Sequence, residues 1–181
     1  MVREGDLGFV CNHAVKWRPS WDCIFVETVD NSAYGLEQIR LLEQVSYGLI
    51  ICKNNYPHHP LRSIRKIRAL RKFPRLMLLP EYQASSEDVV RDSGGLCAGQ
   101  GSFIFPQYAS SILTMVFFAV RSGAREIWLH GADALLGGSR GGLLNLHATE
   151  RLSVPFSTVF ERVRSQLEMS GIIIKIAEEF E

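Results

Sequence analysis

Short apolar runs alternate along this chain with longer amphipathic runs, and that alternation limits the folds open to it. Continuous apolar runs are typical of buried strands, whereas apolar residues three or four positions apart are typical of helices. Strands that alternate with helices of about 10–16 residues form parallel β-α-β units, with helices on both faces of the sheet. The pattern therefore predicts an α/β fold with a mostly parallel sheet in three layers.

The expected elements follow one another in chain order. We expect strands at 7–11, 23–28, 48–52, 75–79, 126–130 and 172–177. We expect helices at 34–45, 61–73, 108–123 and 157–171, with Ser157 as an N-cap and with Gly123 and Gly171 as C-terminal stops. The three-residue spacing of apolar positions in the first expected helix predicts one apolar side, made of Leu36, Ile39, Leu42 and Val45. The strands at 48–52 and 126–129 are expected to be buried.

Length and charge bound the class of protein. With 181 residues, we expect a single domain over 1–181. The net charge of +1 argues against a dedicated nucleic-acid binder. The N-terminus has no apolar signal-peptide core, and no apolar run reaches the length of a membrane span, so a cytoplasmic protein is expected. The four cysteines form no C-x-x-C pair, which predicts reduced cysteines and no zinc site.

Polar side chains follow the expected strands. Since ligands of open parallel sheets bind beyond the carboxyl ends of the strands, these positions are the first candidates for a site. They are Asn12, His13, Glu27, Asp30, Lys53, Asn54, Asn55, His130 and Asp133. Such a set suits a polar ligand with hydroxyl groups and a phosphate. The alternative is that asparagine and aspartate simply favour turns.

Two further segments carry candidate functions. The glycine-rich segment 131–150 is expected to be a flexible lid, in which Arg140 could meet a phosphate and His147 could act as a general base. Plain disorder and a surface histidine are the alternatives. The basic helix, together with Arg75, gives a segment 61–75 that is either a solvated helix face or a peripheral contact with a membrane.

Residues 110–133, "SSILTMVFFAVRSGAREIWLHGAD", resemble a signature of the bacterial sialyltransferases of glycosyltransferase family 42. In that signature a helix ends at a glycine and a strand runs into Gly-x-Asp. Residues 8–13, "GFVCNH", resemble the family's second strand, which ends in an asparagine that contacts the nucleotide. Residues 21–56 are similar to the family in the order and spacing of their elements.

The resemblance implies a Rossmann-like domain that transfers a sugar from CMP-sialic acid to a glycan acceptor, with inversion and without a metal or other cofactor. It assigns Asn12, Ser111 and Asp133 to the nucleotide side and His147 to the general base. Arg140 would neutralise the phosphate, and Asn54 and His130 complete the expected substrate-binding set. A bacterial or phage source and a homo-oligomer are further expectations, and contact of the basic segment 61–75 with a membrane would place the cytoplasmic protein at the inner face of that membrane.

The chain also departs from the family. Its start matches the family's second strand, so the first nucleotide-binding strand and loop have no counterpart. Leu135 and Leu136 stand in the region where the family has two tyrosines. A non-catalytic binding or assembly module is therefore an alternative. Because the signature at 110–133 also occurs in pterin pyrophosphokinase-like proteins, a diphosphotransferase that uses ATP and Mg²⁺ is a third possibility.

Overall fold

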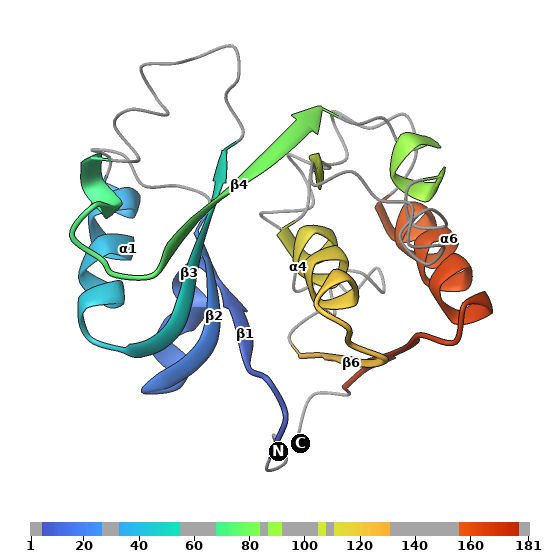
Figure 1. The fold of residues 1–181 in the computed structure, drawn as a ribbon, viewed down its shortest axis with the longest axis horizontal. Helices are drawn as coiled ribbons and strands as arrows, with labels where there is room; N and C mark the ends of the chain where they lie inside the picture. Colours follow the sequence, from blue (N-terminus) through green and yellow to red (C-terminus); the bar gives the residue numbers. More distant parts are fainter. Residues whose placement is uncertain are drawn as a thin grey trace. The chain divides into compact units, whose positions relative to one another are not determined.

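A computed structural model describes residues 5–26, 33–54, 68–83, 87–91, 105–107, 111–130 and 156–177. The chain falls into two compact units, Met1–Glu81 (unit 1) and Tyr82–Glu181 (unit 2). Figure 1 shows the elements of both units. The expectation of a single domain over 1–181 stays a prediction.

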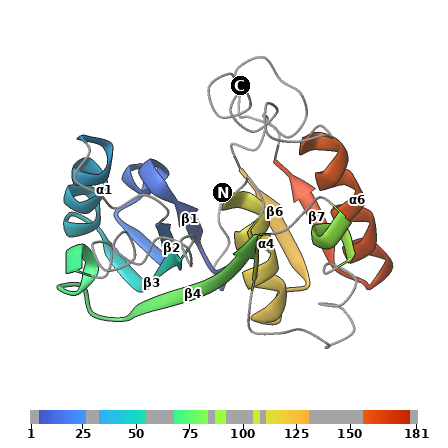
Figure 2. The same ribbon diagram turned by 90° about the horizontal axis from the view of Figure 1, so that it is seen from above.

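Unit 1 is built on parallel strands that lie side by side in the order of the chain. Its elements are β1 (Phe9–Cys11), the 3-10 helix η1 (Asn12–Trp17), β2 (Ser20–Val26), α1 (Ala33–Glu43), β3 (Ser46–Asn54), a helical turn at 68–70, and β4 (Leu76–Gln83). The sheet of unit 1 has the strand order β1-β2-β3-β4, and the short strand β5 (Phe105–Gln107) belongs to unit 2. The pairs β1–β2, β2–β3 and β3–β4 are all parallel. Figure 2 shows β1 to β4 in this succession.

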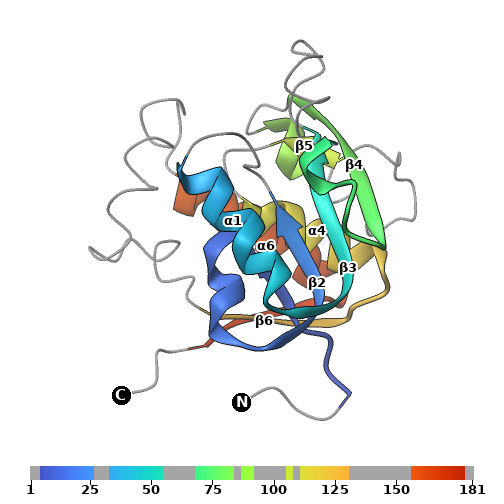
Figure 3. The same cartoon turned by 90° about the vertical axis from the view of Figure 1, so that its left-hand side faces the viewer.

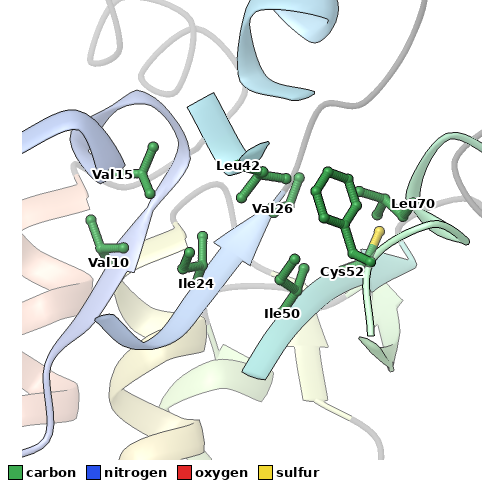
Figure 4. Close-up of a cluster of buried hydrophobic side chains, with 9 residues drawn as sticks. Val10, Val15, Ile24, Val26, Leu42, Ile50, Cys52 and Leu70 are labelled. Carbon is green, nitrogen blue, oxygen red and sulfur yellow. The ribbon is translucent and has the colours of Figure 1, made fainter. Parts of the chain in front are cut away.

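The strand order explains where the helices of unit 1 lie. Right-handed crossovers that always step in the same direction place every connecting element on the same face of the sheet. Figure 3 shows α1 and η1 over one face of β2 and β3. On that face, side chains of β1, β2 and β3 pack against Leu42 of α1, Val15 of η1 and Leu70, as Figure 4 shows.

The central strands are buried on both faces, as their continuous apolar runs predict. Ile24 and Ile50 belong to the helix-covered core, and Phe25 and Ile51, which point the opposite way, are also fully buried. β2 and β3 approach so closely at Gly48 that a Cβ there would lie 2.6 Å from the backbone oxygen of Asp22. Glycine is therefore required at position 48.

Unit 2 contains a second, two-stranded parallel sheet. Its elements are α4 (Ser111–Arg121), β6 (Glu126–Leu129), α6 (Phe156–Met169) and β7 (Ile173–Ile176), besides a helical turn at 87–91. β6 and β7 pair in parallel, with Trp128 opposite Lys175. Gly123 and Gly171 follow the two helices with φ of 96° and 77°, which confirms both as helix stops. The buried faces of α6 and β7 include Phe160, Leu167 and Ile174.

The outward face of the β6–β7 pair corrects one expectation. We expected residues 126–129 to form a buried strand, but Trp128 is 46% exposed and Glu126 is exposed as well. The pairing register places Ile173 and Lys175 of β7 on the same face, and Ile173 is 48% exposed. Only alternate residues such as Leu129 and Ile174 are buried. The pair is therefore a half-covered sheet.

The predicted α/β fold with a mostly parallel sheet is confirmed. The N-cap prediction at Ser157 is wrong by position, since α6 already begins at Phe156. Of the predicted helix at 61–73, residues 68–70 are helical and 61–67 lie outside the described residues. No helix in the described parts of the chain is both long and apolar enough to cross a membrane.

Candidate functional site

Asn12 occupies an unusual backbone conformation at the carboxyl edge of unit 1. It is the first residue after β1, is half-buried, and has a φ of 50°. This left-handed region is costly for most side chains, but asparagine is among those that tolerate it best. The turn lets η1 begin directly at the edge of the sheet. The predicted substrate-binding residue therefore lies at the end of a parallel strand, where open α/β sheets bind ligands.

Gln38 of α1 holds this turn in place. Its Nε2 donates a hydrogen bond of 3.1 Å to the backbone carbonyl oxygen of Asn12. The Gln38 side chain is fully buried. Its Oε1 is the one buried side-chain atom among the described residues that has no hydrogen-bond partner. A buried acceptor left unpaired costs about 1–3 kcal/mol. The edge beside Asn12 thus has a buried acceptor oxygen whose hydrogen-bonding capacity is unused in the described structure.

Gln38 was not predicted as a site residue, because the apolar side predicted for α1 is not the side that is buried. The predicted apolar side included Leu36, yet Leu36 is 46% exposed. The buried stripe instead runs through Gly35, Gln38 and Leu42, at spacings of three and four residues. The same spacing rule, applied to this register, would have shown a polar residue inside the apolar face of a helix. Such a residue is a signal for a buried polar contact.

Asn54 lies on the same edge as Asn12. It is the last residue of β3, and its Cα pairs with Pro80 of β4. In the sheet register, Cys11 of β1 is level with Phe25 of β2, and Phe25 with Ile51 of β3. Strand spacing and rise then separate the Cα atoms of Asn12 and Asn54 by roughly 12 Å. Two of the predicted residues, Asn12 and Asn54, thus lie at the same edge of the sheet. For Asn54 this holds for the position of its backbone.

Two other predicted residues belong to unit 2. Ser111 is half-buried and is the first residue of α4, three residues after the predicted start of this helix at 108. His130 directly follows β6, as the sequence predicts, and is exposed. Asp133, Arg140 and His147 lie outside the described residues, together with the whole predicted lid at 131–150.

Cysteine chemistry adds little to this edge. Cys11, Cys23 and Cys52 are not in disulfides among the described residues, and Cys97 lies outside the described residues. Burial, with a smaller contribution from the charge of Asp22, raises the pKa of the Cys23 thiol to about 11. A thiol with so high a pKa is a poor nucleophile at neutral pH. Within the described ranges, no three His, Cys, Asp or Glu side chains are grouped to hold a metal ion.

A hollow lies on the surface of unit 2, between the helical turn at 87–91 and α6. Val90, Glu161, Arg162 and Gln166 are among its lining residues. Arg162 donates two hydrogen bonds, of 2.9 and 3.0 Å, to the carboxylate of Glu87, and this pairing lowers the pKa of Glu87. The charges of this pair already satisfy one another at an exposed position. The hollow is therefore a weaker candidate than the edge at Asn12.

Comparison of the chain with protein-family models, with curated proteins and with solved structures finds no match. The case for a function therefore depends on the residues themselves.

Proposed function

We propose that this chain is a sialyltransferase-like glycosyltransferase that binds a nucleotide sugar, most simply a CMP-linked sugar, at the carboxyl edge of its parallel strands. The observation that carries the proposal is the left-handed turn at Asn12, directly after β1 and fixed by buried Gln38. Parallel α/β sheets bind nucleotides at such edges. The resemblance of residues 8–13 and 110–133 to the sialyltransferases supplies the substrate class.

The proposed reaction is an inverting displacement. His147 takes the proton of an acceptor hydroxyl, whose oxygen attacks the anomeric carbon of the sugar. The bond between that carbon and the phosphate oxygen breaks, and CMP leaves with the electron pair. Arg140 neutralises the charge that develops on the phosphate. The reaction needs no metal, and a cytoplasmic location is part of the proposal.

The remaining predicted residues have binding roles in this proposal. Asn12, Ser111 and Asp133 contact the nucleotide, and Asn54 and His130 contact the rest of the substrate. An asparagine amide offers two donors and an acceptor, so it can pair with ribose hydroxyls or with a base. Asn12 is suited to this task because its backbone is already fixed in one conformation, which reduces the entropy lost on binding.

Calorimetric titration of the full chain tests the proposal. We expect binding of CMP and of CMP-sialic acid that is unchanged by a metal chelator. The absence of heat with any nucleotide at millimolar concentration would contradict the proposal. Binding of ATP that requires Mg²⁺, without binding of CMP, would support the diphosphotransferase alternative instead.

Two matched variants separate the side chain of Asn12 from its backbone. Asn12→Gly keeps the left-handed turn and removes the amide, so we expect the turn to be retained and CMP binding to weaken at least about tenfold, the equivalent of one hydrogen bond to a charged or polar partner. Asn12→Ala removes the amide and also strains the turn, which lowers the free energy of unfolding by about 1–2 kcal/mol. A glycine variant that binds CMP as tightly as the parent would remove Asn12 from the site.

His147→Ala distinguishes an enzyme from a non-catalytic module. In the proposed mechanism this variant keeps CMP binding and loses sugar transfer, since only the proton acceptor is removed. Loss of a general base typically lowers the rate by about 10²–10⁴-fold. A binding module would show CMP binding and no transfer in both the parent and the variant.

A further inference from the structure

The amino-terminal edge of the unit 1 sheet, opposite the edge that carries Asn12, combines basic and exposed apolar residues. We define this basic edge by Lys16, Trp17, Arg18, Arg71, Lys72 and Arg75, all of which are exposed. Lys16 to Arg18 directly precede β2, and residues 71–75 directly precede β4. Since the strands are parallel, both connections reach the sheet at the same edge.

A backbone hydrogen bond and an ion pair join these two parts into one surface. The backbone N–H of Ser46, where β3 begins, donates to the carbonyl oxygen of Pro19, where β2 begins, at 2.8 Å. Three residues before Ser46, Glu43 at the end of α1 forms an ion pair with Lys72. Arg18 and Lys72 are therefore connected through contacts between neighbouring residues at one edge of the sheet.

The edge is positively charged. The segment 68–75 carries four exposed basic residues and no acidic one, since Arg68 adds to the three already named. Among the described residues, the carboxylates at or near the edge are Asp6, Asp22 and Glu43. Glu43 is paired with Lys72, and Asp22 accepts the backbone N–H of Gly8 at 2.6 Å. Among the described residues, no ion pair involves Lys16, Arg71 or Arg75, so these cations are available to an anionic partner.

Two of the most exposed apolar side chains of the described residues lie on the same edge. Trp17 is 68% exposed between Lys16 and Arg18. Leu7, just before β1, is 69% exposed, and Arg18 lies close by, since a Cβ on Gly8 would be 3.3 Å from its Nη1 atom. Tryptophan flanked by basic residues is typical of the membrane–water interface. A soluble polyanion would use the charges, but it would leave Leu7 and Trp17 in water.

We infer that the basic edge docks on an anionic phospholipid bilayer, with Trp17 and Leu7 in the headgroup region and the cations beside lipid phosphates and carboxylates. The nine residues of β3 run from this edge to the opposite one, a length of about 30 Å. Docking therefore leaves the carboxyl edge with Asn12 facing away from the bilayer. The inference concerns a different surface from the proposed active site and does not depend on it.

Co-sedimentation of the full chain with vesicles tests the inference. We expect binding to phosphatidylcholine vesicles that contain phosphatidylserine, weak binding to phosphatidylcholine alone, and a loss of binding as salt is raised. Lys16→Gln and Arg71→Gln should each lower the partition coefficient about fivefold, and Trp17→Ala should lower it by a similar factor. Arg125→Gln and Trp128→Ala, at exposed positions of unit 2, are the matched controls and should bind as the parent does.

Three results would overturn the inference. The first is equal or absent binding to both kinds of vesicle. The second is a loss of binding in the two control variants as large as that in Arg71→Gln and Trp17→Ala. The third is tight binding to heparin or to nucleic acid at a salt concentration at which vesicles are not bound, since this would identify a soluble polyanion as the partner.

Discussion

The two parallel sheets of this protein use apolar residues in different ways. In β2 and β3, neighbours such as Ile50 and Ile51 are both fully buried, so the strands are covered on both faces. In β6 and β7, burial alternates, and the outward face carries Trp128, Ile173 and Lys175. A run of three consecutive apolar residues is therefore buried on both faces of the strand in unit 1, but on one face alone in unit 2.

The outward face of the β6–β7 pair is stabilised by a polar cluster instead of by a covering layer. The ammonium group of Lys175 lies 4.5 Å from the centre of the Trp128 ring. The carboxylate of Glu126 accepts hydrogen bonds of 2.8 Å from both Lys175 and the indole N–H of Trp128. These contacts hold the aromatic ring against its own strand pair. Such exposed contacts contribute far less to stability than a fully buried side chain does.

The largest expected effect comes from two isoleucine truncations, one in each sheet. Ile51→Ala should lower the free energy of unfolding by about 2–5 kcal/mol, because it leaves a cavity among fully buried neighbours. Ile173→Ala, at a position 48% exposed, should cost less than about 1 kcal/mol. Urea unfolding of both variants measures the difference. Equal losses would mean that the outward face of β7 is covered in solution.

The next effect concerns how closely β2 and β3 approach. Gly48→Ala should cost about 1–3 kcal/mol, since its Cβ would lie 2.6 Å from a backbone oxygen that cannot move without the strand. Gly171→Asn is the control, because nothing lies within 4 Å of that position and asparagine tolerates its positive φ. The control should unfold within about 0.5 kcal/mol of the parent. A tolerated alanine at position 48 would show that the two strands can separate locally.

A smaller effect is expected on the outward face of β6–β7. Lys175→Met removes the ion pair with Glu126 and the contact with Trp128 while keeping a similar length of side chain. We expect a loss of about 0.5–1 kcal/mol that shrinks at high salt, measured by thermal unfolding at two ionic strengths. A loss above about 3 kcal/mol, or one insensitive to salt, would require a buried environment for this face.

The effect that is smallest at neutral pH, where it vanishes, is a pH dependence that originates in β2. The folded pKa of Cys23 is about 11, above its unfolded value of 9.0, because burial disfavours the thiolate. The neutral thiol is present in both states below pH 9, so no stability is lost there. Between pH 9 and 11 the unfolded chain ionises first, and the free energy of unfolding falls. Cys23→Ala should lack this part of the alkaline decline, and identical profiles for parent and variant would contradict the shifted pKa.

Pattern reasoning predicted the elements better than their environments. The strand and helix order followed from apolar spacing, and Gly123 and Gly171 ended their helices where the sequence indicated. The exposure of Trp128 could not be predicted from its own run. It depends on the pairing register, which sets Glu126 and Lys175 on the same face, and register is a tertiary property.

In the candidate site, too, one residue could be predicted from the local sequence and another could not. Asn12 was predictable, since a polar residue directly after an apolar strand is a local signal. Gln38 was not chosen because the packing of α1 against η1, and not its average apolar periodicity, decides which stripe is buried. Its role became visible only when the bond to the carbonyl of Asn12 was known.

The strand order of unit 1 has a consequence for how the protein is made. Each strand from β2 to β4 pairs with the strand that precedes it in the chain, so none of these strands waits for a partner synthesised much later. Loop closure between successive strands is short-range, which favours fast folding. A ribosome releases the chain from its N-terminus at about 5–20 residues per second. The sheet can therefore grow strand by strand during translation, with β1 and β2 as its template.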